Sequence, residues 1–112
     1  MTSGVDSRLR ERVVLFGPVD GESVFKDQRS LDELSRLVES AGGQEVGRLV
    51  QALHQPSPKT YFGSGKIEEL RALVEGENAD LAVFDRELSP AQGRNIEAAL
   101  GVRVIDRSEL IL

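Results

Sequence analysis

The sequence predicts an α/β fold: an open, parallel, four-stranded sheet with helices packed on its faces. Three observations support this. Short apolar runs rich in β-branched residues alternate with segments of helical periodicity, in the order β-α-β-α-β-α-β. Strands that alternate with helices need crossover connections, and right-handed crossovers give a parallel sheet. Residues suited to capping stand where three of the helical segments begin, so local and global signals agree.

The first strand is predicted at 12–16, a β-branched apolar run that Gly17-Pro18 ends. Residues 1–11 are polar and lack periodicity. We therefore expect a flexible N-terminal segment there, followed by one α/β domain over 12–112. The stretch 19–29 is polar and rich in turn-forming residues, which predicts a loop.

A helix is predicted from Ser30, because Glu33 follows three residues later and the two form a capping-box pattern. Gly42-Gly43 supplies a left-handed exit for this helix. A second strand is expected at 45–53, where Gly47 indicates a bulge or a close neighbour.

The middle of the chain then changes character. The segment 54–65 (HQPSPKTYFGSG) holds two prolines and two glycines, which favour a loop over a strand or a helix. An amphipathic helix is predicted at 66–75, and Gly76 ends it.

The C-terminal third repeats the alternation. A continuous apolar strand is expected at 81–85, then a helix at 89–100, in which Gln92 completes a capping box. The fourth strand is predicted at 102–106 (VRVID). Asp106 with Glu109 three residues on predicts the first turn of a further helix.

Composition narrows the function. The chain has 112 residues, no cysteine and one histidine, which excludes thiolate chemistry and Cys- or His-rich metal centres. No apolar run approaches the roughly 20 residues of a membrane span, so we expect a cytoplasmic protein. With 14 basic and 19 acidic residues, the net charge of −5 disfavours binding of nucleic acid by bulk charge. The exception is 46–67, where Arg48, Lys59 and Lys66 stand without any acid.

Ligands of open parallel sheets bind at the carboxyl ends of the strands, and unusual residues gather there in this sequence. Gly63, Ser64, Gly65 and Lys66 lead into a helix and resemble a phosphate cradle, in which free N–H groups and an ammonium face an anion. The P-loop pattern is not met, because Thr60 replaces its first glycine and Ile67 follows the lysine. The alternative is that both glycines only permit a positive-φ turn and that Lys66 is a solvated residue.

Two further groups lie at the predicted strand ends. Tyr61 and its neighbour Phe62 could stack on unpaired bases, although one of them is better placed in the core. Asp85, Glu87 and Asp106 form an acidic group, yet a receiver-type phosphoacceptor would need more acids after the first strand. The structural alternative is that the two aspartates accept backbone N–H bonds and pair with Arg94 or Arg107.

Three strings carry a family resemblance: PSPKTYFGSGKIEELRALVE, ADLAVFDRELSPAQGRNIEAALGVRVIDRSELIL and, more weakly, SLDELSRLVESAGGQEVGRLVQ. They resemble the N-terminal domain of the HflX family of translational GTPases, over about residues 12–112. The resemblance implies an α/β subdomain that precedes a helical hairpin and a G domain. Proteins of this family associate with the large ribosomal subunit and are implicated in ribosome splitting or rescue.

The resemblance implies a role without turnover for this chain, since no Walker-type loop or NKxD sequence is present and GTP and Mg²⁺ are expected only at a G domain. We expect a docking platform for ribosomal RNA and for a downstream G domain. The phosphate- or RNA-binding candidates are Lys59, Tyr61, Gly63, Ser64, Gly65, Lys66 and Arg94. The family-signature cluster is Asp85, Glu87, Ser89, Pro90, Gln92, Asn95, Asp106 and Arg107.

Two alternatives stay open. The Gly63 to Lys66 turn could bind a nucleotide phosphate without any catalytic apparatus. The chain could instead be a structural module that forms a homodimer, because it ends on the apolar residues Leu110, Ile111 and Leu112.

Overall fold

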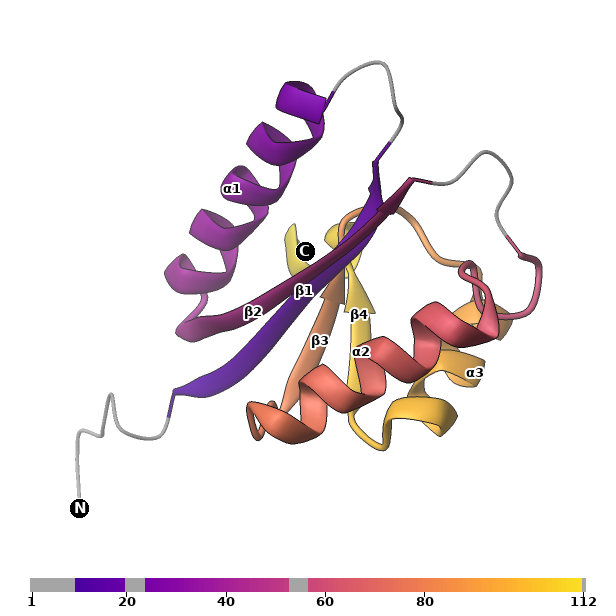
Figure 1. Ribbon diagram of the computed structural model, residues 1–112. Coiled ribbons are helices and arrows are strands. Elements are labelled where there is room, and N and C mark those ends of the chain that lie inside the picture. Colours follow the sequence, from indigo (N-terminus) through magenta and orange to yellow (C-terminus); the bar gives the residue numbers. More distant parts are fainter. Residues whose placement is uncertain (1–9, 20–23, 53–56, 112) are drawn as a thin grey trace.

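Four strands form one parallel sheet in the computed structural model, which describes residues 10–19, 24–52 and 57–111 (Figure 1). They are β1 (Glu11–Val19), β2 (Gly43–Ala52), β3 (Leu81–Phe84) and β4 (Arg103–Asp106). Their spatial order is β2-β1-β3-β4, with every neighbouring pair parallel. The predicted open, four-stranded parallel sheet is therefore confirmed.

Helices cover both faces of this sheet. They are α1 (Val24–Ser40), α2 (Ser64–Gly76), α3 (Pro90–Leu100) and the single-turn α4 (Arg107–Ile111). In Figure 1, α1 and α4 lie on one face of the sheet, and α2 and α3 lie side by side on the other. The order of elements along the chain is the predicted alternation.

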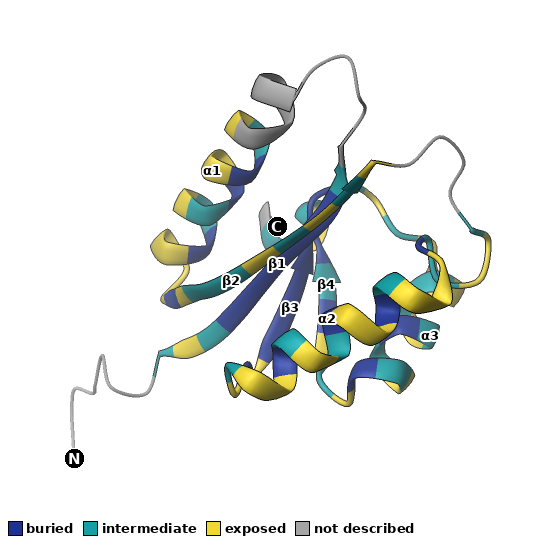
Figure 2. Ribbon diagram, viewed as in Figure 1, coloured by how far each residue is buried: buried dark blue, intermediate teal, exposed yellow. Residues whose placement is uncertain are grey.

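Alternate residues of the strands build two cores. Val13 and Leu15 of β1 face α1, whereas Val14 and Phe16 face α2 and α3. All four are buried because β1 is central and both of its faces are covered, as Figure 2 shows. Apolar side chains of α2 and α3 complete the larger core, namely Ile67, Leu70, Val74, Ile96 and Leu100.

The start of α1 corrects one prediction. The helix begins at Val24, six residues before Ser30, so the predicted capping box at Ser30 and Glu33 is wrong. Both side chains are used elsewhere: the Ser30 hydroxyl donates to Asp85, and Glu33 accepts from Arg107. A serine inside a helix can point its hydroxyl at a neighbouring element, and capping motifs cannot be told from such contacts by sequence alone.

The end of β1 corrects another. The strand continues through Gly17-Pro18 to Val19, where the sequence had predicted a stop at Phe16. The partner strand β3 ends at Phe84, opposite Phe16, so beyond that point β1 pairs only with β2. A proline is tolerated in a strand that has a neighbour on one side only.

Other local predictions are confirmed. Ser89 and Gln92 form the capping box of α3, with Pro90 at its start. Gly42 and Gly101 have φ of 96° and 75°, the left-handed conformation that ends α1 and α3. The register of β1 against β2 shifts at Val13/Val14, which is the bulge that Gly47 had indicated.

Some expectations fall on residues that the structure does not describe. The predicted flexible segment lies, up to residue 9, outside the described residues, as do positions 54–56 of the predicted loop and Leu112 of the apolar C-terminal run. Among the helices that are described, none is long and apolar enough to cross a bilayer.

Candidate functional site

Asp85 and Asp106 stand at the carboxyl ends of neighbouring strands, the edge where a site was predicted. Asp85 directly follows β3 and Asp106 is the last residue of β4. Their exposed fractions are 2% and 5%, and within the described residues they are the buried charged groups. A buried carboxylate is costly unless it is paired and hydrogen-bonded. Their partners therefore decide whether either acid is free for chemistry.

Both oxygens of Asp85 are engaged. Oδ1 accepts from Nη2 and Nε of Arg107, at 2.8 and 3.1 Å, and from the Ser30 hydroxyl at 3.2 Å. Oδ2 accepts from Nη1 of Arg86 at 3.0 Å. Nη2 of Arg107 also donates to the Ser30 carbonyl at 2.8 Å, and Nη1 donates to Glu33 at 3.1 Å. Asp85 thus ties α1 and α4 to the end of β3.

The electrostatics of this network fit a structural role. Burial lowers the pKa of the Arg107 guanidinium, but its hydrogen bond and charge interaction with Asp85, then those with Glu33, outweigh burial and raise that pKa overall. The guanidinium of Arg107 and the carboxylate of Asp85 hold each other in place. The predicted structural alternative, in which Asp85 pairs with Arg107, is confirmed.

Both carboxylate oxygens of Asp106 accept hydrogen bonds from backbone N–H groups. Its Oδ2 accepts from Leu88 N at 2.9 Å and its Oδ1 from Glu109 N at 3.1 Å. Oε1 of Glu109 accepts from Asp106 N at 3.1 Å, which completes the predicted capping box of α4. Of the predicted acidic group, only Glu87 is exposed, and the described residues contain no cluster of three or more ligating side chains that could hold a metal ion.

The signature residues of α3 fix the loop that precedes α2. Nε2 of Gln92 donates to the Ser57 carbonyl at 2.9 Å, and Nδ2 of Asn95 donates to the Lys59 carbonyl at 2.9 Å. These contacts span 35 and 36 residues of sequence. In Figure 1 the loop accordingly lies against the N-terminal end of α3. Gln92 and Asn95 therefore act as a clamp on residues 57–62.

The clamped loop is itself tightly turned. Ser57 and Tyr61 exchange two backbone hydrogen bonds, at 2.8 and 2.9 Å. Phe62 N donates to the Thr60 carbonyl at 2.8 Å, a three-residue turn with Tyr61 at its centre and a φ of 70°. The Tyr61 ring packs edge-on against Phe84, with centroids 4.6 Å apart, and Phe62 is buried in the core. Tyr61 is thus partly occupied by packing rather than wholly free for stacking on a base.

The Gly63 to Lys66 turn forms the N-terminus of α2. Its N-cap, Gly63, has a φ of −68°, and neither Gly63 nor Gly65 has a positive φ, so the alternative of a positive-φ turn is wrong. Gly63, Ser64 and Gly65 are exposed, and no side chain caps the helix. Nζ of Lys66 lies 3.2 Å from Oε1 of Glu69, so the ammonium forms an ion pair with a residue one turn further along α2. The lysine is therefore not a free cation.

Arg48, Lys59 and Lys66, the three cations of the basic stretch, differ in whether they are ion-paired. Arg48 pairs with Glu45 and, at 2.8 Å, with Asp32, and these interactions raise its pKa. The largest cause is the hydrogen bond that the Arg48 guanidinium donates to the Glu45 carboxylate. Lys59 is exposed, and its ammonium has no partner among the residues that the structure describes. Lys59 is therefore the cation of this stretch that is available to an external anion.

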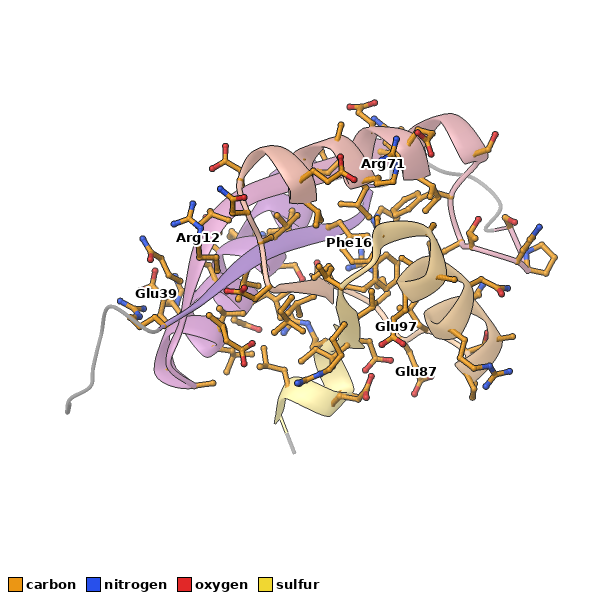
Figure 3. All side chains as sticks on the ribbon, turned by 90° about the horizontal axis from the view of Figure 1, so that it is seen from below. Arg12, Phe16, Glu39, Arg71, Glu87 and Glu97 are labelled. Atoms are coloured by element: carbon orange, nitrogen blue, oxygen red, sulfur yellow. The ribbon has the colours of Figure 1, made fainter. Side chains whose placement is uncertain are left out.

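Arg94 is also exposed, but it stands in an acidic setting. It lines a groove of about 740 Å³ between α3, β4 and α4, together with Glu87, Glu97, Asp106 and Glu109. Figure 3 shows Glu87 and Glu97 close together beside α3. Oε2 of Glu97 accepts from Val104 N of the edge strand at 3.0 Å. The carboxylates make this groove less suited to a phosphate than the surroundings of Lys59 are.

Sequence reasoning missed two participants. An added Cβ at Gly17 would lie 2.9 Å from Cβ of Asp85, so the close approach of these strand ends needs a glycine. Ser30 joins the Asp85 network from the middle of α1. The position of Gly17 at the end of an apolar strand could have indicated this close approach. Nothing in the sequence distinguishes Ser30 from a helix cap.

The sequence of this chain matches a known protein family. Residues 28–112 match the family model described as "GTP-binding GTPase N-terminal". This match covers the clamp, the Asp85 network and all of the signature residues. The chain belongs to that family.

Members of the HflX group are among the relatives. Proteins named "GTPase HflX" from Flavobacterium psychrophilum and Caldanaerobacter subterraneus subsp. tengcongensis are 40% and 38% identical over 103 and 106 residues. These alignments cover 91% and 95% of this chain but 25% and 24% of the relatives. The Escherichia coli protein of the same name is 41% identical over 87 residues, which is 78% of this chain and 20% of that protein. This chain thus corresponds to the N-terminal domain region of HflX, and it spans about a quarter of the length of these relatives.

A solved structure supports the fold. The chain described as "crystal structure of SsGBP and GDP complex" superposes with a TM-score of 0.61 at 22% identity. The superposition covers 90% of this chain and 27% of that one. At this identity the likeness supports the α/β fold of this chain.

Proposed function

We propose that this HflX N-terminal domain is a non-catalytic docking platform in the cytoplasm, which contacts RNA of the large ribosomal subunit and supports a G domain elsewhere in the protein. The engagement of Asp85 and Asp106 supports the absence of catalysis. Both buried acids have structural partners, so neither is free as a general base, nucleophile or phosphoacceptor. GTP and Mg²⁺ belong to the G domain in this proposal.

The observation that carries the RNA contact is Lys59. Its ammonium is exposed and has no partner among the described residues, on a turn whose backbone is fixed by α3. The chain carries a net charge of −5, so attraction by overall charge is absent and a local contact is needed. Phosphate oxygens are the anions that an RNA surface presents in quantity.

Binding to large ribosomal subunits tests this proposal. The chain is sedimented with purified large subunits at several salt concentrations, and the bound fraction gives Kd. We expect log Kd to rise with log salt, with a slope of about 0.7 to 0.9 for each phosphate contacted. A flat dependence, or no binding at low salt, overturns the proposal.

Two variants separate a local contact from general charge. Lys59→Ala is expected to weaken binding and to reduce the salt slope by about one contact. Arg103→Ala removes one exposed positive charge from the amino end of β4 and is the matched control. Equal loss in the two variants means that no specific contact is made at Lys59.

A nucleotide phosphate at the start of α2 is a second candidate, favoured by one observation. The helix has no side-chain cap, and its first N–H groups stand at exposed residues. Isothermal titration with ATP and with GTP, on the wild type and on Lys66→Ala, tests it. Absence of heat with the wild type ends this candidate, and heat that Lys66→Ala does not reduce places the nucleotide elsewhere.

A further inference from the structure

We propose that Asn95 is a positioning residue, assisted by Gln92, that fixes Lys59 for contact with an RNA phosphate. This inference rests on the proposed docking function and deepens it. It assigns a role to two polar residues of α3 whose side-chain amides reach across to another segment of the chain.

The backbone of Lys59 is held on both sides. Its N–H donates to Oγ of Ser57 at 3.2 Å, and its carbonyl accepts from Nδ2 of Asn95 at 2.9 Å. Gln92 holds the Ser57 carbonyl at 2.9 Å, so the residue that binds the Lys59 N–H is itself anchored to α3. The side chain of Lys59 remains exposed and without a partner among the described residues. A fixed backbone with a free cation is the arrangement that reduces the entropy lost on binding.

The conformation of the turn has a cost. Tyr61 has a φ of 70°, a region that residues other than glycine rarely adopt. Such a conformation persists only where surrounding contacts hold it, and strained positions gather at functional sites. Here the contacts that hold it are the Ser57–Tyr61 bridge, the packing of Tyr61 on Phe84 and the clamp from α3.

The free cation favours RNA over a protein partner. A phosphate chain offers anions at regular spacing, and a lysine binds them as a point charge without demanding one geometry. Contact of Lys59 with a ribosomal protein is the alternative that the experiment must distinguish.

A double-mutant cycle on binding to large ribosomal subunits is the test. Asn95→Ala is expected to weaken binding about two- to tenfold, because the backbone of the Lys59 turn must then be ordered on binding. Because Asn95 acts through Lys59, the Asn95→Ala/Lys59→Ala double variant is expected to bind no more weakly than Lys59→Ala alone. Gln44→Ala, which truncates an exposed amide on β2, is the matched control and is expected to bind like the wild type.

The outcomes separate this inference from the proposed function. Circular dichroism and thermal unfolding first establish that each variant is folded at the assay temperature. If the wild type does not bind, the docking function and this inference both fall. If Lys59→Ala weakens binding while Asn95→Ala binds like the wild type, or the two losses add in the double variant, the inference falls and the docking function stands.

The nature of the partner is read by crosslinking. The chain has no cysteine, so Pro58→Cys, on the exposed residue next to Lys59, gives a single site for a photoreactive azidophenacyl group and leaves the Lys59 ammonium in place. Crosslinks from this position to ribosomal RNA support the inference. Crosslinks to ribosomal protein alone, or none at a salt concentration where the variant still binds, overturn it.

Discussion

The guanidinium of Arg107 meets the carboxylate of Asp85 at 2.8 Å, and this pair joins the first residue of α4 to the end of β3. The aspartate side chain is 1% exposed and the arginine side chain 23%, so the pair is shielded from solvent on the aspartate side. The same guanidinium reaches the Ser30 carbonyl in α1. Three elements that are distant in sequence thus depend on one side chain for their relative placement.

Arg107→Ala is expected to destabilise the domain by about 3 kcal/mol, because it leaves Asp85 buried with fewer partners. Arg86 and Ser30 still contact the carboxylate, which limits the loss. Urea unfolding followed by circular dichroism measures the free energy of unfolding. Arg36→Ala, on an exposed arginine of α1, is expected to change it by less than about 0.5 kcal/mol. Equal stability of the two variants would show that the buried pair contributes nothing.

The sequence was sufficient for the sheet and for the starts of α3 and α4 because these depend on local signals. The capping boxes at Ser89 and Asp106 were readable since both partners lie within three residues. The same pattern failed at Ser30 because its side chain serves a contact 55 residues away. A pattern of identical local form therefore means different things according to what packs against it.

The sequence identified the residues of the site but not which of them contact one another. Asp85, Gln92, Asn95 and Arg107 all stood out in the sequence, yet the structure divides them between an ion-pair network and a loop clamp. The left-handed φ of Tyr61 had no sequence signal, because glycine or asparagine is the expected residue there. Long-range partners and backbone strain are set by tertiary packing, which single-sequence patterns do not encode.

Gly17→Ala is expected to destabilise the domain by about 1 to 3 kcal/mol, since its methyl group would lie 2.9 Å from Cβ of Asp85. Gly65→Ala is the matched control in α2, where an added methyl group meets no atom within 4 Å. Alanine favours a helix more than glycine does, so this control is expected to stabilise by up to about 1 kcal/mol. Thermal unfolding of both variants measures the opposite signs, and a shift of the same sign in both contradicts the packing argument.

Ser89→Ala is expected to cost about 1 kcal/mol, because Gln92 N loses its side-chain acceptor at the start of α3. Ser89→Asp retains an acceptor and is expected to stay close to the wild type. Ser108→Ala, on an exposed serine of α4, is the control for loss of a hydroxyl. Urea unfolding checks all three, and a loss in Ser108→Ala as large as in Ser89→Ala would contradict a capping role.

The pKa of the Glu68 carboxyl on α2 is lowered below its ordinary value of 4.5, first by a hydrogen bond from Arg71 and then by the charge of that arginine. Nη2 of Arg71 lies 2.8 Å from Oε1 of Glu68. A folded-state pKa below the unfolded one adds stability above pH 4.5, which is lost as the pH falls through the folded-state value.

Arg71→Gln is expected to bring the Glu68 pKa back toward 4.5, measured by NMR titration of the side-chain carboxyl carbon. Stability at neutral pH is expected to stay nearly unchanged, because an exposed ion pair on a helix contributes little. Added salt at about 1 M, where the Debye length is about 3 Å, is expected to reduce the difference in Glu68 pKa between the wild type and the variant. A Glu68 pKa that is the same with and without the arginine would mean that the pair does not persist in solution.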